Sequence, residues 1–540
     1  MRGMHGLMMD FPLTLAAIFR RAEALSGGRE IVTRLPDKTL HRYRYQDFTQ
    51  RTRRLVRALQ DLGVRSGDRI ATLAWNHYQH LEVYFAAPLA GGVLHTLNPR
   101  LHPDELAYII THAGDRVVVV DRTLLPLFER IRPSVSVPII IVVGDESGLP
   151  AGMIGFESLL AKATAAADAP DPPEDTAAAL CYTTGTTGQP KGVLYSHRSL
   201  VLHSFGISLA DVMGLSERDV VAPVVPMFHA NAWGLPYASV MVGAKLVMPG
   251  PHLDPASLAD LFQQERVTIT AGVPTIWMGL LQLLDANPGA YDLSSFRLML
   301  VGGSAVPQAM IDAFEKRHGL RIVQGWGMTE MSPVGTISHV PCSMADARPD
   351  AQYRQRAKQG RPLPFVELRA RNEDGLVPTD GKTMGELETR GPWIAASYFN
   401  RDDCADRFTA DGWFKTGDIV TIDERGTVEV QDRSKDLIKS GGEWISSIAI
   451  ENALMGHPAV AEAAVIAIAD AKWGERPLAA IVLKAGAVAT PAELRDFLAP
   501  RFPKFWLPDA FAFVDAIPRT AAGKFLKSSL RERFKDYRVP

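Results

Sequence analysis

The segment "CYTTGTTGQPKGVLYSH" (residues 181–197) decides how the chain is interpreted, because it places a loop rich in glycine and threonine between two apolar runs. Residues 177–181 have the character of a buried strand that ends there, and residues 193–195 begin the next one. The loop between them, with its single lysine Lys191, suits backbone N–H groups that wrap phosphate oxygens. It differs from the G-x-x-x-x-G-K-[ST] loop, because Gly192 follows Lys191 and no Ser or Thr stands there for a magnesium ion. Taken alone, it could also be a flexible hairpin tip.

Length and composition indicate a large globular protein. At about 150 residues per domain, 540 residues predict three or four structural units. The 46% of apolar and 22% of charged residues allow a large core. A formal net charge of −2 at pH 7 gives no general attraction to nucleic acid or to acidic membranes, so neither is expected as a partner.

Cysteine usage and the N-terminus favour a cytoplasmic protein. Cys181, Cys342 and Cys404 are far apart, so we expect neither a disulfide framework nor a cysteine-based zinc site. Asp10 and Pro12 interrupt the apolar N-terminal stretch, which favours an amphipathic helix over a signal peptide. No apolar run reaches the roughly 18 residues that span a bilayer, so no transmembrane segment is expected.

The rhythm of the chain predicts an α/β fold. From about residue 40 to 340, helical patterns such as residues 47–63 alternate with short β-branched runs, which implies sheets flanked by helices with ligand loops at the carboxyl ends of strands. The expected strands include residues 69–75, 116–121, 137–144, 178–184, 219–226, 298–303 and 321–327. After about residue 360, period-two alternation in residues 412–433 predicts a β-rich unit, and a compact α+β unit of about a hundred residues follows.

Four more loops carry chemistry at the expected strand ends: "PMFHANAWG" (226–234), "VGGSAVP" (301–307), "QGWGMTE" (324–330) and "KTGD" (415–418). The Gly-Gly-Ser turn would let a planar ring lie against bare backbone. The aromatic between two glycines offers a stacking face, and Asp418, placed at the end of a strand, offers a carboxylate for two ribose hydroxyls. With the loop after Cys181, these segments predict an ATP site.

Together with "DRSKDLIKSGGEW" (432–444) and "PRTAAGK" (518–524), these loops resemble the motif set of the AMP-forming adenylate superfamily over residues 40 to 530. The segments "PMFHANAWGLPYA" and "KSGGEWIS" are most similar to bacterial medium- and long-chain fatty-acyl-CoA synthetases. The resemblance implies a large N-terminal domain of helix-flanked sheets with a β-rich subdomain (1–431). It also implies a small mobile α+β C-terminal domain (432–540), a hinge at Asp432, and a homodimer formed through the N-terminal region.

The resemblance implies a role for each matching residue. The ATP-binding set is Thr183, Thr184, Gly185, Thr186, Thr187, Gly188, Lys191, Gly303, Ser304, Gln324, Gly325, Trp326, Thr329, Asp418, Arg433, Lys435 and Lys439. Lys524, His229, Thr329 and Glu330 form the catalytic set, and Thr183 with Glu330 would bind Mg²⁺. His229, Ala230 and Trp233 would line the acyl pocket, and Gly441, Gly442 and Trp444 would contact CoA. Many relatives carry tyrosine at the Trp326 position, so a hydrogen bond from that phenol is lost here.

The implied reaction explains why these groups are needed. A carboxylate accepts a thiol only after its oxygen has become a leaving group, which attack on the α-phosphate of ATP achieves by forming an acyl-AMP and releasing pyrophosphate. Lys524 would bridge the carboxylate and the α-phosphate, and cations in a dry site stabilise the charged transition state. Rotation of the C-terminal domain about Asp432 would then replace Lys524 with the segment 439–444 for transfer to CoA.

Several alternatives remain. His229 and Trp233 could be ordinary core residues, and Lys435 and Lys439 could belong to a solvated face. The acid could be a short thioether or aryl acid, whereas the apolar segment 229–234 argues against dicarboxylates and amino acids. A catalytically silent nucleotide-binding protein is the non-enzyme alternative, although Lys524, Glu330 and Asp418 argue against it. A kinase-like ATPase and a G-x-S-x-G hydrolase lack their motifs.

Overall fold

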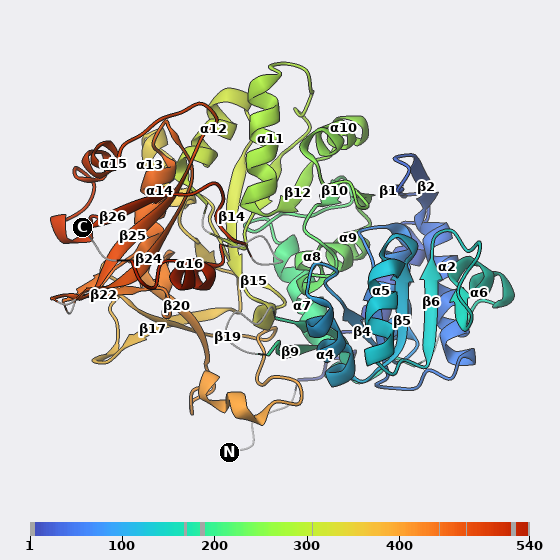
Figure 1. The fold of residues 1–540 in the computed structure, drawn as a ribbon. Helices are drawn as coiled ribbons and strands as arrows, with labels where there is room; N and C mark the ends of the chain where they lie inside the picture. The colour runs from blue at the N-terminus through green and yellow to red at the C-terminus, as the bar shows by residue number, and fades with distance from the viewer. Residues whose placement is uncertain are drawn as a thin grey trace. The chain divides into compact units, whose positions relative to one another are not determined.

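The computed structural model describes residues 6–166, 170–183, 189–304, 306–441, 443–470, 472–519 and 525–537. Its contacts divide the chain into two compact units, Met1–Pro251 with Tyr398–Asn400 and His252–Ser397 with Arg401–Pro540. Each unit combines helices and β-sheets, and the chain runs from the blue and green elements of the first unit to the green, yellow and red elements of the second (Figure 1). The boundary predicted at residue 432 falls within the second unit and stays a prediction.

The first unit contains a sheet with the strand order β7-β6-β5-β3-β4-β8-β9. Its pairs are parallel except for the antiparallel hairpin β8–β9. A second group of strands follows the order β10-β11-β1-β2. The strands are β1 (Glu30–Arg34), β2 (Leu40–Arg44), β3 (Arg69–Leu73), β4 (Val93–Thr96), β5 (Asp115–Asp121), β6 (Ile139–Val143), β7 (Met153–Gly155), β8 (Ala177–Tyr182), β9 (Gly192–Ser196), β10 (Val220–Pro223) and β11 (Lys245–Met248).

Helices cover these strands because their apolar side chains recur at helical spacing. In α2, Phe48, Leu55, Val56 and Leu59 are buried on one side of the helix. The helices of this unit are α1 (Leu15–Leu25), α2 (Tyr45–Asp61), α3 (Tyr78–Leu89), α4 (Pro103–Ala113), α5 (Leu125–Ile131), α6 (Phe156–Lys162), α7 (His197–Ser208), α8 (Ala230–Trp233) and α9 (Leu235–Val242). Continuous apolar runs such as "VVVV" in β5 are buried, as is typical of parallel strands covered on both faces.

The second unit begins with strands in the order β16-β15-β14-β13-β12, in which β12, β13 and β14 are parallel. A β-rich sheet follows, with the order β18-β17-β19-β20-β21. The strands are β12 (Ile269–Gly272), β13 (Leu298–Val301), β14 (Ile322–Gly327), β15 (Val334–Ile337), β16 (Arg361–Pro362), β17 (Glu367–Asn372), β18 (Gly375–Leu376), β19 (Gly385–Arg390), β20 (Phe414–Ile422) and β21 (Val428–Arg433). Helices α10 (Pro255–Glu265), α11 (Pro274–Ala286), α12 (Gln308–His318) and α13 (Pro349–Arg356) belong to the same unit.

The last hundred residues form an α+β layer around strands β24 and β25. Alternate residues of β24 face different cores: Val465 packs with α14 and α15, and Ile466 packs with Leu530 of α16. The elements are β22 (Ile438–Ser440), β23 (Glu443–Ile445), α14 (Ser447–Met455), β24 (Val460–Asp470), β25 (Gly474–Leu483), α15 (Pro491–Leu498), β26 (Ala510–Phe513) and α16 (Lys527–Arg533).

The predicted α/β class is confirmed. The predicted strands correspond to β3, β5, β6, β8, β10, β13 and β14, and the predicted helices to α1 and α2. One local prediction is wrong: Asp418 lies inside β20, which continues to Ile422, instead of at a strand end. Gly417 has a positive φ of 75°, as a turn residue would, but β20 continues through it, and pairing with β21 extends from Asp418 to Ile422. Within the described ranges, no helix has both the length and the apolar character needed to cross a membrane.

Candidate functional site

The predicted phosphate loop begins and ends on the hairpin β8–β9 of the first unit. The backbone N–H of Thr183 donates to the Lys191 carbonyl at 2.9 Å. In return, the Lys191 N–H donates to the Thr183 Oγ1 at 3.3 Å. The two predicted site residues are therefore bonded to each other at the base of the loop. Thr184, Gly185, Thr186, Thr187 and Gly188 lie outside the described residues.

Aromatic side chains pack closely around the base of the loop. The Lys191 Nζ lies 5.0 Å from the centroid of the Tyr398 ring, within the range of a cation–π contact. A Cβ at Gly192 would lie only 3.1 Å from the Tyr182 Cζ and 3.2 Å from the Phe399 Cβ. The Phe399 N–H also donates to the Gly192 carbonyl at 2.8 Å. Glycine at 192 therefore permits the segment 398–400 to lie against the hairpin.

The predicted acyl segment has a strained backbone. Ala230, Asn231, Ala232 and Trp233 have φ values of 42°, 53°, 49° and 57°, so four consecutive residues with side chains form the left-handed turn α8. Each such residue costs roughly 1–2 kcal/mol, and strain of this kind is concentrated at functional sites. Ala230 and Trp233 are buried. The strain supports a specific role for this turn over an ordinary core segment.

His229 immediately precedes the turn and lines a small cavity of the first unit. The cavity residues are Thr96, Leu97, Asn98, Leu101, Ile109, Tyr182, Phe228 and His229. A contact of 3.3 Å between the Cys181 Sγ and the Asn231 Oδ1 joins the same two segments. The first unit therefore brings the predicted acyl segment next to the strand that leads into the phosphate loop.

In the second unit, the predicted adenine-side residues gather at one sheet edge. Val301 pairs with Gly272 on one side and with Gln324 on the other, so the residues that follow these strands lie side by side. Gly303 has a φ of 86°, which suits glycine at the turn before Ser304. Gln324 is 2% exposed, and within the described residues its Oε1 has no hydrogen-bond partner. Gly325 follows it on β14 and pairs with Ile337.

Three predicted ATP residues are in direct contact. The Trp326 Nε1 donates to the Asp418 Oδ2 at 2.9 Å, and the Arg433 Nε lies 2.6 Å from the Asp418 Oδ1. Asp418 and Arg433 face each other across β20 and β21. Asp418 is buried with both carboxylate oxygens engaged, whereas Arg433 is more than a third exposed. The indole N–H gives this cluster a polar contact that a tyrosine would have to make through its hydroxyl.

Thr329 and Glu330 follow directly, in a short 3-10 turn with both side chains buried. The Glu330 carbonyl accepts from the Ala395 N–H at 2.8 Å, which fixes the turn. Among the described residues, no three His, Cys, Asp or Glu side chains gather as a metal site. A magnesium ion needs few protein ligands, because it keeps waters and substrate phosphates. The Thr183 hydroxyl of the first unit and the Glu330 carboxylate of the second unit are each oxygen donors of the kind that magnesium prefers.

Asp432, the predicted hinge residue, is bonded to the start of α14. Its Oδ2 accepts from the Ser447 N–H at 2.7 Å and from the Ser447 hydroxyl at 2.6 Å. Its Oδ1 accepts from the Arg433 N–H at 2.8 Å. Burial raises the pKa of Asp432, although Lys527 and the hydrogen bonds from Ser447 oppose that rise. The carboxylate thus connects the end of β21 to the C-terminal elements.

The predicted nucleotide and CoA segment forms the hairpin β22–β23. Lys439 pairs with Trp444, and the side chains of Lys435 and Lys439 are exposed. Gly441 has a φ of 61°, and its N–H donates to the Trp473 carbonyl at 2.8 Å. Gly442 and Lys524 lie outside the described residues.

The structure adds Trp473 to this segment. A Cβ at Gly441 would lie 2.7 Å from the Trp473 Cε3, so the indole packs directly on the glycine backbone while staying 46% exposed. Arg476 supports the same hairpin, since its Nη1 donates to the Ser440 Oγ at 3.0 Å. Sequence reasoning missed both residues, because neither belongs to a recognised loop and the contacts depend on the pairing of β22 with β25.

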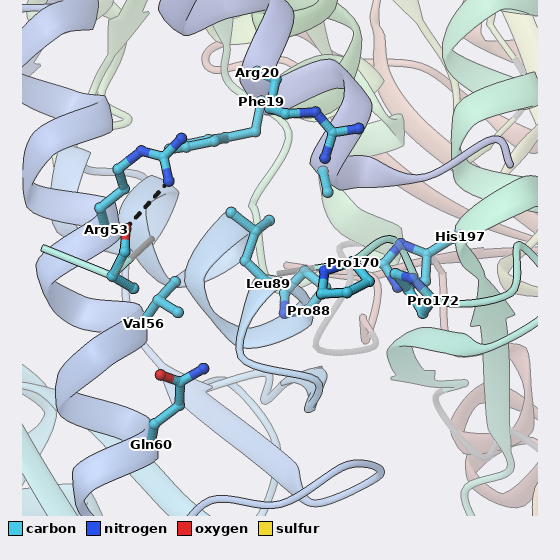
Figure 2. Close-up of a pocket in the computed structure, with 12 residues that line it drawn as sticks. Phe19, Arg20, Arg53, Val56, Gln60, Pro88, Leu89, Pro170, Pro172 and His197 are labelled. Atoms are coloured by element: carbon cyan, nitrogen blue, oxygen red, sulfur yellow. Dashed lines mark hydrogen bonds between the residues drawn. The ribbon is translucent and has the colours of Figure 1, made fainter. Parts of the chain in front are cut away.

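Another cavity of the first unit lies among α1, α2, α3 and the segment before β8 (Figure 2). Two arginines line it, but both form ion pairs. The Arg20 Nη2 lies 2.6 Å from the Asp171 Oδ2, and the Arg53 Nη2 lies 2.6 Å from the Glu23 Oε2. Arg53 also donates to the Ala166 carbonyl at 3.3 Å (Figure 2). None of the predicted site residues is among those that line this cavity. Because its charges are already satisfied, we assign it a packing role.

The geometry defines a class of protein: an α/β enzyme in which a hydroxyl-rich hairpin loop, a buried carboxylate with tryptophan and arginine, and a glycine hairpin are each held on strands. Comparison with known proteins agrees. The family model described as AMP-binding enzyme matches residues 19–399, and the model described as AMP-binding enzyme C-terminal domain matches residues 449–524. The chain belongs to the AMP-binding enzyme family, and the predicted superfamily is confirmed.

Two sequence relatives and one solved structure indicate which members of the family this chain resembles. The chain is 51% identical to a long-chain-fatty-acid–CoA ligase of Thermus thermophilus, over 99% of this chain and 98% of the relative. It is 45% identical to the 3-methylmercaptopropionyl-CoA ligase of Ruegeria pomeroyi, over 99% of both chains. The crystal structure of the anthranilate CoA ligase AuaEII in complex with anthranoyl-AMP matches with a TM-score of 0.86 and 27% identity, over 97% of this chain and 98% of that one.

Proposed function

We propose that this protein is an ATP-dependent fatty-acid:CoA ligase that forms an acyl-AMP with release of pyrophosphate and then transfers the acyl group to CoA. The observation that carries the proposal is the contact of Trp326, Asp418 and Arg433, three residues predicted from separate loops to bind one nucleotide. The near-complete match to curated CoA ligases supports the same reaction.

The adenosine and α-phosphate of ATP would be bound by residues of the second unit. Asp418 would accept both ribose hydroxyls, with the Arg433 guanidinium holding the carboxylate in place. Trp326 would stack on adenine, and the buried Oε1 of Gln324 would accept from the exocyclic amine. Gly303 and Ser304 would cover the other face of the ring. Thr329 would donate to the α-phosphate.

The phosphate end would be bound by the residues of the hairpin loop. Backbone N–H groups of residues 183–188 and the Lys191 ammonium would surround the β- and γ-phosphates. Thr183 and Glu330 would hold Mg²⁺. When bound, this ion neutralises phosphate charge that develops as pyrophosphate leaves. Lys524 would hold the substrate carboxylate against the α-phosphate, and the exposed Lys435 and Lys439 would approach the nucleotide.

The second half-reaction would use the segment 439–444. Rotation of residues 432–540 about Asp432 would remove Lys524 and place Gly441, Gly442 and Trp444 beside the pantetheine thiol. The exposed face of Trp473 would then be available for the CoA adenine. This division into domains 1–431 and 432–540 is supported by the separate C-terminal family match at residues 449–524.

The acid itself is proposed as a medium- or long-chain fatty acid, with the strained turn 230–233 and His229 at its carboxylate end. The relative that acts on 3-methylmercaptopropionate, by its printed name, supports a short thioether acid as the second candidate. A panel of acids from three to eighteen carbons, with methylthiopropionate and benzoate included, separates these possibilities by kcat/KM. A preference for methylthiopropionate over octanoate would replace the fatty-acid assignment.

The decisive test of the chemistry is exchange of labelled pyrophosphate into ATP without CoA. We expect exchange that depends on the carboxylic acid, and Lys524→Ala should abolish it while acyl-AMP supplied directly still becomes acyl-CoA. Absence of exchange with every acid in the panel would reject adenylation.

We further propose that the enzyme works in the cytoplasm as a homodimer. The exposed thiol of Cys342 supports a reducing compartment. Leu7, Met8 and Met9 are 94%, 87% and 93% exposed, which supports an N-terminal contact between two copies. Light scattering on the full chain and on a chain without residues 1–11 tests this proposal. We expect the full chain to have the mass of a dimer and the shortened chain that of a monomer. Equal oligomeric states of the two chains would reject the N-terminal contact.

A further inference from the structure

A buried network of polar side chains connects the hinge carboxylate to the first residue of α16. The Lys527 Nζ lies 2.7 Å from the Glu451 Oε1 and donates to the Ser447 Oγ at 2.5 Å. The Ser447 hydroxyl in turn donates to the Asp432 Oδ2 at 2.6 Å. An unbroken chain of bonds therefore runs from Lys527 through Ser447 to Asp432.

This network is almost completely inaccessible to water. Lys527 and Glu451 are 9% and 6% exposed, and Asp432 and Ser447 are 1% and 0% exposed. The Glu451 Oε1, which contacts Lys527, also accepts from the Val465 N–H at 2.7 Å. Burial works against the charged form of Lys527, but Glu451, Asp432 and Asp436 outweigh it and raise the pKa of the ammonium. Lys527 therefore remains charged within the network.

Stability alone does not explain a buried lysine at this position. Replacement of a buried ion pair by apolar residues of similar volume is often neutral or stabilising, so such pairs are weak evidence for a stabilising role. They are better explained where they fix one geometry among several. Here the fixed geometry is that of α16 relative to α14 and Asp432.

The position of Lys527 gives that geometry a functional consequence. Lys527 follows Lys524 by three residues in the sequence. The chain on both sides of residues 520–524 is also held: the Leu526 N–H donates to the Pro518 carbonyl at 2.7 Å, and Arg519 lies 2.6 Å from Glu462. The Arg519 guanidinium lies 4.7 Å from the centroid of the Phe525 ring.

We propose that Lys527 is a positioning residue for adenylation, which fixes the segment carrying Lys524 to the hinge through Ser447 and Glu451. The inference rests on the proposed function, because it requires Lys524 to act in adenylation only. Lys527 touches no substrate in this account. Asp432 and Lys527 both bond to Ser447 in the first turn of α14. We therefore expect α16 to move together with α14 when the hinge rotates, so that the same rotation brings Lys524 to the nucleotide.

The two half-reactions of Lys527→Met test this role. We expect pyrophosphate exchange to fall at least about tenfold, and conversion of supplied acyl-AMP to acyl-CoA to stay within about threefold of the unmodified enzyme. Lys527→Arg should recover most of the exchange, because it restores the charge. Lys535→Met is the matched control, since Lys535 is an exposed lysine just after α16, and it should leave both half-reactions unchanged.

Each outcome bears on the inference. Equal loss of both half-reactions, or no loss of either, would overturn it. If Lys527→Met fails to fold, the double variant Lys527→Met with Glu451→Gln removes the unpaired buried charge and is measured in its place, and a double variant that also fails to fold would make the network purely structural. Lys524→Ala and the unmodified enzyme, run in parallel, separate the two levels. Normal exchange in Lys524→Ala would reject the premise that Lys524 acts in adenylation, whereas absence of exchange in the unmodified enzyme would reject the proposed function itself.

Discussion

Asp418 and Asp432 lie in the same sheet and are both buried, each residue being 1% exposed, but their partners differ in kind. In the pairing of β20 with β21, Asp418 faces Arg433 and the next residue, Ile419, faces Asp432. Asp418 is bonded to the side chains of Trp326 and Arg433, which come from β14 and β21. Asp432 is bonded to the backbone and hydroxyl of Ser447, at the first turn of α14.

This difference separates a binding carboxylate from a connecting one. The partners of Asp418 are the indole N–H of Trp326 and the guanidinium of Arg433, which hold the carboxylate in one orientation, so that ribose hydroxyls can share its oxygens. The partners of Asp432 join two elements whose relative rotation is proposed to switch the half-reactions. Loss of Asp418 should therefore damage both half-reactions, whereas changes at Asp432 should divide them.

The largest expected effect is that of Asp418→Ala. Hydrogen bonds to a charged group contribute roughly 1.5–3 kcal/mol each, so loss of two should lower kcat/KM for ATP at least about 100-fold. Because acyl-AMP carries the same ribose, its conversion to acyl-CoA should fall as well. Steady-state exchange and thioester assays measure both. Asp374→Ala, at an exposed position of the turn between β17 and β18, is the control. An Asp418→Ala variant impaired in only one half-reaction would contradict the comparison.

The next largest effect is expected at Trp326, where substitutions separate stacking on adenine from the hydrogen bond to Asp418. Trp326→Phe keeps a stacking face but removes the N–H that reaches Asp418, so the KM for ATP should rise about three- to tenfold. Trp326→Leu removes both contributions and should raise it further, by about another factor of ten. Titration with ATP in the exchange assay separates the two variants. If phenylalanine and leucine were equally harmful, stacking would have no part in binding.

The smallest expected effect is a pH dependence of stability that arises at Glu451, in the network of polar side chains around Asp432. Burial raises the pKa of Glu451 to about 7, while Lys527 and the Val465 N–H limit the rise. The folded state then binds more protons than the unfolded state, so the free energy of unfolding contributed by this group falls as the pH rises from about 4.5 to about 7. Titration of Lys527, whose pKa is raised, lies at alkaline pH outside this window.

Glu451→Gln should remove that dependence. Between pH 5 and pH 7.5, the thermal midpoint of the variant should fall less than that of the unmodified protein, by about 1 to 3 °C. Scanning calorimetry at the two pH values measures the difference. Glu82, whose pKa burial also raises to about 7, is present in both proteins and cancels from it. Parallel curves for the two proteins would exclude Glu451 as the titrating group.

The sequence predicted the elements and the loops well, because these depend on local patterns. The hairpin around Thr183 and Lys191 follows from two apolar runs and the glycines between them. The contact of Trp326 with Asp418 joins residues 92 apart, so only the resemblance to a family could suggest it.

Other features had no sequence signal at all. The left-handed turn from Ala230 to Trp233 contains no glycine, and its conformation depends on the packing of its neighbours. Nothing in the sequence distinguishes Lys527 and Glu451 from charged residues on the surface of a helix, because burial of a charge depends on which elements cover it. Asp418 was predicted at a strand end because Gly417 imitates a turn.

The most direct test of the contrast between the two carboxylates is to measure both half-reactions in Asp432→Pro, beside Asp432→Ala. Proline restricts φ at the hinge, whereas alanine removes only the carboxylate. Both variants lose the carboxylate that accepts from Ser447, so pyrophosphate exchange should fall to the same extent in each. The account predicts that Asp432→Pro lowers acyl transfer to CoA at least about tenfold further than Asp432→Ala does. Equal acyl transfer in the two variants would contradict it.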